Sequence, residues 1–159
     1  MYERILVPLD GSKEGESALP YVENLVSKLS SDVKVEVTLL QVTSRLEPRV
    51  VSGRAVPDIA YPEKQMEEAR KKAIDYLNKT GEALRSKGVA VAVKVVVGDA
   101  AEEIVKAAEE INSDLIAMST HGRSGVSRWA FGSVTEKVLR HGGKIPILTL
   151  KAPRKTEKA

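Results

Sequence analysis

The stretch DLIAMSTHGRSGVSRWAFGSVTEKV, residues 114–138, joins a short apolar run to a segment with helical spacing. From Met118 onward it holds three glycines and six hydroxyl side chains, which leave much backbone exposed and add little bulk. A short apolar run is typical of a strand that is covered on both faces. The stretch therefore predicts a strand, a glycine-containing loop and a helix, the unit from which parallel sheets are built.

The same alternation runs through the whole chain. Helical spacing of apolar residues is found at 18–29, 62–87 and 101–111 and around Val134, Val138 and Leu139, and apolar or alternating runs lie at 4–9, 33–42, 89–97, 114–118 and 146–150. Strands that alternate with helices favour a parallel sheet, and right-handed crossovers restrict its topology. We expect an α/β fold with one doubly wound, Rossmann-like, five-stranded parallel sheet, strand order 3-2-1-4-5, and helices on both faces.

Composition narrows the class of protein. The chain has 159 residues, the size of one domain with a sizeable core, and 42% of them are apolar. It has no cysteine, which excludes disulfides, thiol catalysis and zinc–cysteine sites. No signal segment precedes the first apolar run, and no run approaches the ~20 apolar residues of a membrane span. We expect one domain over residues 1–151, cytoplasmic and without a membrane segment.

The positive charge is concentrated at one end. The formal net charge is +3, and the last nine residues, KAPRKTEKA, carry four basic residues and one acid. The rest of the chain is therefore formally neutral. We expect residues 152–159 to be a disordered basic tail, and the distribution argues against a nucleic-acid surface. A nucleic-acid role carried by the tail is the remaining alternative, and it would depend steeply on salt.

One connection is unusually long. Residues 43–62 contain three prolines and three arginines and show no clear periodicity. Loops of this length in compact domains are commonly lids, binding loops or interface elements. A mobile insertion without such a role is the alternative.

Two loops are placed to hold a ligand. Ligands of doubly wound sheets bind beyond the carboxyl ends of the strands, where the strand order reverses. PLDGS, residues 8–12, follows the first strand, and the glycine stretch follows the fourth. If these strands are neighbours, both loops line one crevice.

The glycine stretch ends at a predicted helix start, where backbone N–H groups and the helix dipole favour an anion. Ser133 and Glu136 match the S-x-x-E capping box, which predicts Ser133 as the helix cap. Gly122, Gly125 and Gly132 would let a phosphate approach the backbone, or would simply form turns. The chain has neither a P-loop nor a G-x-G-x-x-G motif, which excludes a P-loop NTPase and a standard dinucleotide site.

Four segments resemble the universal stress proteins of the UspA family: RILVPLDGS, DLIAMSTHGRSG, FGSVTEKVLRH and PILTL. The ATP-binding branch of that family has the pattern G-x2-G-x9-G-[ST]. Gly122, Gly132 and Ser133 match it, whereas Ser119 stands where the pattern has its first glycine. The resemblance implies an ATP-binding, stress-response regulatory module. The alternative is a dimeric scaffold that has lost nucleotide binding, because a strained backbone or a crowding hydroxyl at Ser119 would oppose it.

The resemblance also implies that ATP lies in the crevice, with Mg²⁺ or Mn²⁺ held through its phosphates. Asp10 would accept hydrogen bonds from ribose hydroxyls, and Val42 would meet adenine through its backbone. The implied binding residues are Pro8, Leu9, Asp10, Val42, Met118, Ser119, Gly122, Gly132, Ser133, Val134 and Thr135.

No nucleophile–base pair and no paired carboxylates are visible, so we expect no dedicated enzyme and at most slow ATP hydrolysis. Asp10 has two other interpretations. It could be a phosphoacceptor, as in response regulators, although the first strand ends in a lone aspartate rather than an acidic cluster; or it could be a turn residue before Gly11.

The remaining conspicuous side chains belong to no metal set. We interpret His121 and His141 as surface residues, with His141 near the end of the last helix, where the dipole favours it. Arg123 and Arg128 would meet phosphate or solvent. Trp129 and Phe131 are expected to anchor the loop or a subunit contact.

The last strand predicts a partner. Residues 146–150, PILTL, form an edge strand in the expected order, and an apolar edge associates unless it is covered. Pro146 is tolerated at the start of such a strand. The resemblance implies a homodimer through this strand, with further protein partners unknown.

Overall fold

The structure is a computed structural model that describes residues 3–29, 33–43, 46–51, 54–60, 63–120 and 132–151. Its main sheet is parallel throughout, in the order β5-β2-β1-β6-β7. These strands are β1 (Arg4–Pro8), β2 (Glu36–Thr43), β5 (Ala90–Val97), β6 (Leu115–Ser119) and β7 (Ile147–Leu150). When the five strands of this sheet are counted along the chain, β5 is the third, β6 the fourth and β7 the fifth. The order is therefore the predicted 3-2-1-4-5, and the predicted fold class is confirmed.

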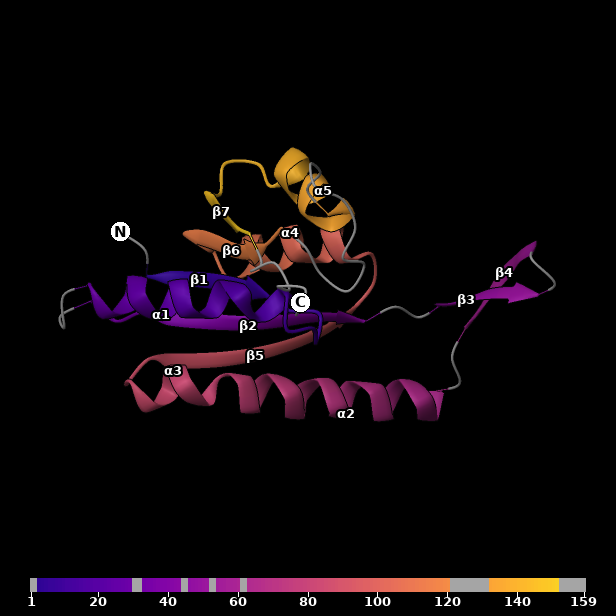
Figure 1. The fold of residues 1–159 in the computed structure, drawn as a ribbon, viewed down its shortest axis with the longest axis horizontal. Coiled ribbons are helices and arrows are strands. Elements are labelled where there is room, and N and C mark those ends of the chain that lie inside the picture. Colours follow the sequence, from indigo (N-terminus) through magenta and orange to yellow (C-terminus); the bar gives the residue numbers. More distant parts are fainter. Residues whose placement is uncertain are drawn as a thin grey trace, which may run out of the picture.

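Helices cover both faces of this sheet (Figure 1). One face carries α1 (Leu19–Ser27), α2 (Glu63–Thr80) and α3 (Glu82–Ser86), and the other carries α4 (Ala100–Glu110) and α5 (Ser133–His141). Ile5 and Val7 of β1 pack toward the first group, whereas Leu6 between them packs toward the second. Side chains of a strand alternate between its faces, and both faces are covered, so the strands read as nearly continuous apolar runs.

The long connection over residues 43–62 differs from the loop without periodicity that the sequence predicts. It contains two strands, β3 (Leu46–Val51) and β4 (Arg54–Ala60), which form an antiparallel hairpin. Figure 1 shows this hairpin projecting from the body between β2 and α2. The register breaks between Glu47 and Arg49, so Pro48 lies at the irregularity. Prolines within strands occur mainly at bulges and edges, and here they mask the strand pattern in the sequence.

The sequence also predicts that the chain has no membrane segment and that it ends in a basic tail. No helix in the described part of the chain is long and apolar enough to cross a membrane. The predicted tail, residues 152–159, lies outside the described residues.

Candidate functional site

The site begins where two neighbouring strands separate. β1 and β6 pair only at Ile5–Leu115 and Leu6–Ile116. Farther along, β1 stays with β2 as far as Pro8, and β6 stays with β7 as far as Ser119. The central strands therefore diverge toward their carboxyl ends, at the point where the strand order reverses.

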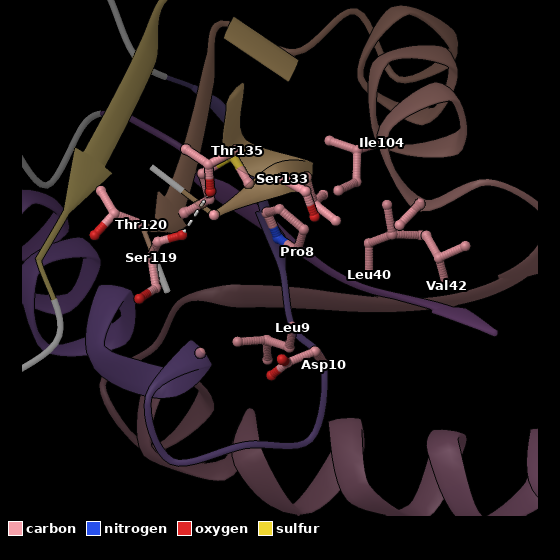
Figure 2. A pocket seen from close by; sticks show the side chains of 15 residues that line it. Pro8, Leu9, Asp10, Leu40, Val42, Ile104, Ser119, Thr120, Ser133 and Thr135 are labelled. Atoms are coloured by element: carbon pink, nitrogen blue, oxygen red, sulfur yellow. Dashed lines mark hydrogen bonds between the residues drawn. The ribbon is translucent and has the colours of Figure 1, made fainter. Parts of the chain in front are cut away.

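A cavity of about 280 Å³ lies at this divergence (Figure 2). Every predicted binding residue except Gly122, which is outside the described residues, lines it. The structure thus brings together the segment after β1, the end of β2, the end of β6 and the start of α5. The lining residues are Pro8, Leu9, Asp10, Gly15, Leu40, Val42, Ala100, Ile104, Met118, Ser119, Thr120, Gly132, Ser133, Val134 and Thr135.

Five lining residues were not predicted: Gly15, Leu40, Ala100, Ile104 and Thr120. Leu40 lies two positions before Val42 on the same strand face, a spacing that would have indicated it. α4 follows β5, so its first turn starts at the carboxyl edge of the sheet and brings Ala100 and Ile104 to the cavity. For Thr120 the sequence carries no signal beyond its position next to Ser119, and for Gly15, five residues after Asp10, it carries none.

The two sides of the cavity differ in polarity. Figure 2 shows Ser119, Thr120 and Thr135 on one side, Leu40, Val42 and Ile104 on the other, and Ser133 between them. Asp10 is the one ionisable side chain among the described lining residues. An apolar wall opposite hydroxyls and a helix start suits a ligand with a flat apolar part and an anionic part.

Asp10 is held by a tight turn after β1. Its Oδ1 accepts hydrogen bonds from the Ser12 backbone N–H at 3.0 Å and from the Ser12 hydroxyl at 2.6 Å. This is the turn arrangement that short acidic side chains adopt, so the interpretation of Asp10 as a turn residue is confirmed. The turn also fixes the carboxylate at the cavity, and the two roles are compatible.

The start of α5 also differs from the prediction. The predicted capping box is wrong: the cap is Gly132, Ser133 is the first helical residue, and no side chain caps the helix. Glu136 instead pairs with Arg140 one turn later, at 2.6 Å. Gly132 donates its N–H to the Thr120 carbonyl at 2.7 Å, and a Cβ on Gly132 would lie 2.9 Å from that oxygen. The close approach of the two backbones favours glycine as the cap, one residue before the expected serine.

Ser119 has an ordinary strand backbone. Among the described residues other than glycine, only Asn112 has a left-handed φ, so serine is unstrained at position 119. Its hydroxyl accepts a hydrogen bond from Ser17 at 3.2 Å, and its carbonyl accepts one from the Thr135 hydroxyl at 3.0 Å. The backbone strain that would have opposed ligand binding at this position is therefore absent.

α4, which brings Ala100 and Ile104 to the cavity, is capped by Asp99. The Asp99 carboxylate accepts hydrogen bonds from the N–H groups of Ala101 at 3.0 Å and Glu102 at 3.3 Å. The bond from Glu102 is the main cause that lowers the pKa of Asp99. Lys137 of α5 lies 3.3 Å from the same carboxylate and links the two helices. Asp99 therefore caps α4, and it is not among the described residues that line the cavity with Asp10.

The structure describes only some of the other conspicuous side chains that the sequence analysis considered. His141 is the last residue of α5, as expected. His121, Arg123, Arg128, Trp129 and Phe131 lie outside the described residues. No group of three or more histidine, aspartate or glutamate side chains is placed to hold a metal ion in the part of the chain that the structure describes.

Comparison with known proteins agrees with this architecture. A family model described as "Universal stress protein family" matches residues 1–151. The Universal stress protein MJ0577 of Methanocaldococcus jannaschii is 32% identical over 160 residues, covering 95% of this chain and 96% of that protein. A solved structure of MJ0577 aligns with a TM-score of 0.73 over 98% of this chain and 99% of that one, at 28% identity.

Two more distant structures share the fold. A universal stress protein in complex with cAMP aligns with a TM-score of 0.62, at 18% identity, over 96% of this chain and 98% of that one. A universal stress protein family protein of Arabidopsis thaliana, solved with AMP bound, aligns with a TM-score of 0.62, at 17% identity, over 95% and 92%. The family match over nearly the whole chain and the relative above 30% identity lead to one conclusion: this chain belongs to the universal stress protein family.

Proposed function

We propose that this protein binds ATP in the cavity between β1 and β6 and acts as a nucleotide-dependent regulatory module in a stress response. One observation carries the proposal: residues from four separate segments, predicted as nucleotide contacts, line a single cavity that ends at the start of α5. Members of the same fold solved with AMP and with cAMP support a nucleotide as the ligand class.

The polarity of the cavity suggests how ATP is oriented. The adenine ring would lie against Leu40, Val42 and Ile104, where apolar surface is buried on binding. Asp10 would accept hydrogen bonds from the ribose hydroxyls. The N–H groups at the start of α5 would meet the phosphates, which favour the positive end of a helix dipole. Mg²⁺ or Mn²⁺ would be held by the phosphates rather than by a set of protein side chains.

Thermal unfolding with and without ATP–Mg²⁺ tests this function. At a ligand concentration near 100 times Kd, binding adds about 2.7 kcal/mol to the free energy of unfolding. For a chain of this size that corresponds to a rise in Tm of roughly 5 to 10 °C. The same protein without ATP but with Mg²⁺ provides the baseline.

Ser133→Phe locates the binding site. Ser133 is exposed, lines the cavity and makes no capping bond, so a phenyl ring there blocks the ligand without a large cost to the fold. The ATP-dependent rise in Tm should disappear. Ser86→Phe places the same ring at an exposed position of α3, on the other face of the sheet, and should keep the full rise. No rise in the unaltered protein at millimolar ATP would contradict ATP binding and leave the dimeric scaffold as the function.

We extend the proposal to a homodimer through β7. β7 is at the edge of the sheet, and Ile147 and Leu148 are only partly buried. The carbonyl groups of Pro146 and Leu150 accept hydrogen bonds from β6, so the intervening N–H of Thr149 points away from β6. An edge strand with an outward N–H pairs readily with a second strand unless it is covered.

Thr149→Pro tests the dimer by sedimentation velocity. Proline removes the outward N–H, which a partner strand would use, and an edge strand tolerates it. The dimer should dissociate while the monomer stays folded by circular dichroism. Leu148→Pro is the matched control, because it alters the side of β7 that faces β6 and should unfold the chain. A Thr149→Pro protein that stays dimeric would contradict this interface.

A further inference from the structure

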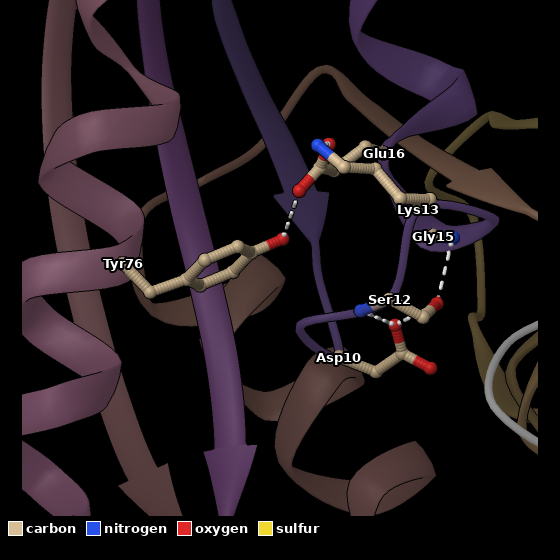
Figure 3. A network of polar contacts seen from close by, with 6 residues as sticks. All are labelled: Asp10, Ser12, Lys13, Gly15, Glu16 and Tyr76. Atoms are coloured by element: carbon tan, nitrogen blue, oxygen red, sulfur yellow. Dashed lines mark hydrogen bonds and ion pairs between the residues drawn. The ribbon is translucent and has the colours of Figure 1, made fainter.

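Tyr76, in the middle of α2, contacts the segment that follows β1 (Figure 3). Its hydroxyl donates a hydrogen bond to Oε1 of Glu16 at 3.1 Å. The other carboxylate oxygen of Glu16 accepts one from Lys13 Nζ at 2.9 Å. Lys13 is almost fully exposed, whereas Tyr76 is partly buried and packs against the core. The bond from Tyr76 is therefore the better shielded of the two.

A short series of bonds leads from Glu16 to the cavity. Glu16 belongs to the 3-10 helix η1 (Gly15–Ala18), and its N–H donates to the Ser12 carbonyl at 3.2 Å. The Gly15 N–H donates to the Ser12 hydroxyl at 2.9 Å. The same hydroxyl donates to Asp10 at 2.6 Å. Figure 3 shows the bond from Tyr76 to Glu16 and the bonds of Ser12 with Gly15 and Asp10.

The turn has little room for independent movement. A Cβ on Gly15 would lie 2.5 Å from Asp10 Oδ1, so the start of η1 is packed directly against the carboxylate. A displacement of η1 must therefore displace Asp10 or break its bonds to Ser12. Interiors packed this closely transmit small shifts rather than absorb them.

We propose that Tyr76 is a positioning residue: through Glu16 and the turn at residues 12–15, it fixes the Asp10 carboxylate for a ligand that carries a vicinal sugar diol. α2, which starts directly after the β3–β4 hairpin, thereby becomes part of sugar recognition. The inference rests on the proposed nucleotide binding, but it concerns the selectivity for ribose rather than binding itself.

The chemistry of Tyr76 suits this role. Burial, and then the negative charge of Glu16, raise the pKa of the Tyr76 hydroxyl well above its usual value. The hydroxyl therefore stays protonated, and remains a donor, at neutral pH. Its bond to a carboxylate is of the charge-assisted type, which is stronger than a bond between neutral groups.

Isothermal titration of the full chain with ATP and with 2′,3′-dideoxy-ATP tests the proposal. The unaltered protein should bind ATP roughly tenfold more tightly, which corresponds to one hydrogen bond of about 1.4 kcal/mol. Tyr76→Phe keeps the packed ring and removes the donor. Its preference for ATP should fall below about threefold, while its affinity for dideoxy-ATP changes by less than about twofold.

Three further variants separate positioning from folding. Glu16→Gln keeps an oxygen that accepts from Tyr76 and should retain the preference, whereas Glu16→Ala should lose it. Tyr21→Phe removes a hydroxyl from a tyrosine that is 58% exposed on α1 and should change nothing.

The titrations distinguish a failure of the role proposed for Tyr76 from a failure of the proposed nucleotide binding. Equal losses for ATP and dideoxy-ATP in Tyr76→Phe would make Tyr76 a purely structural residue and overturn the inference. An unchanged preference would overturn it as well. Failure of the unaltered protein to bind either nucleotide would instead contradict the proposed function, and the inference would fall with it.

Discussion

The two ends of the β1–β6 pair are built in opposite ways. At the amino end, Asp114 accepts hydrogen bonds from the N–H groups of Glu3 at 3.1 Å and Arg4 at 2.9 Å. Asp114 N–H and the Ser113 hydroxyl both donate to the Arg4 carbonyl, at 2.8 and 3.1 Å. At the carboxyl end the same two strands share no pair beyond Leu6–Ile116, and the cavity opens between them.

The difference explains which end is available for a ligand. At the amino end the strand termini bond to each other, so few backbone groups are left for a ligand. At the carboxyl end the strands turn toward different neighbours, and the starts of η1, α4 and α5 lie around the gap. Parallel sheets place all helix starts at this edge, and the reversal of strand order supplies the space.

The largest expected effect comes from the last shared pair before the strands diverge. Ile116 is fully buried between the sheet and α4, and Ile116→Ala should lower the free energy of unfolding by about 2 to 5 kcal/mol. Urea unfolding measures the loss. Leu139→Ala, at a side chain that is 42% exposed, is the matched control and should cost less than about 1 kcal/mol. Similar costs for both would mean that Ile116 is not part of a packed core.

A smaller effect is expected where α5 meets β6. In Gly132→Ala the new methyl group would lie 2.9 Å from the Thr120 carbonyl oxygen, so the helix start must shift. We expect a loss of about 1 to 3 kcal/mol in thermal unfolding without ligand. The neighbouring Ser133→Ala should change stability by less than about 0.5 kcal/mol, because Ser133 makes no capping bond. Equal stability of Gly132→Ala and the unaltered protein would show that this contact can relax.

At the amino end, Asp114→Asn should cost about 1 kcal/mol at neutral pH. Asparagine can still accept a bond but lacks the charge, and solvent exposure limits the loss. The change in Tm should be a few degrees. ATP binding should be unaffected, since Asp114 is at the opposite edge from the cavity. A loss of ATP binding in this variant would contradict the independence of the two ends.

The smallest effect is a pH dependence at the same residue. The backbone N–H of Arg4, more than any other group, lowers the pKa of Asp114 below its usual 3.8. A lowered pKa in the folded state gives stability that is present above the usual value and is lost as the pH falls through the folded value. The Tm difference between the unaltered protein and Asp114→Asn should therefore shrink as the pH falls below the usual pKa of 3.8. A constant difference would mean that charge contributes nothing there.

The sequence predicted the sheet well because its strands are covered on both faces and separated by strongly periodic helices. It predicted ten of the residues that line the cavity, because the family pattern and the binding of ligands at the carboxyl ends of parallel strands indicate the same loops. It did not predict the β3–β4 hairpin, where Pro48 and Pro57 interrupt the alternation of a strand. It also placed the α5 cap at Ser133 instead of Gly132, because a capping box describes local chemistry and omits the Thr120 carbonyl.

By itself, the sequence determined the α/β class, the strand order and the family, because these follow from local periodicity and from motifs read along the chain. Only the tertiary structure decided where β1 and β6 part, that Ile104 faces the cavity, and that Tyr76 reaches Glu16 sixty residues away. These features depend on register and packing between segments far apart in the sequence. No local pattern contains that information, because each contact exists only after the sheet and its helices have come together.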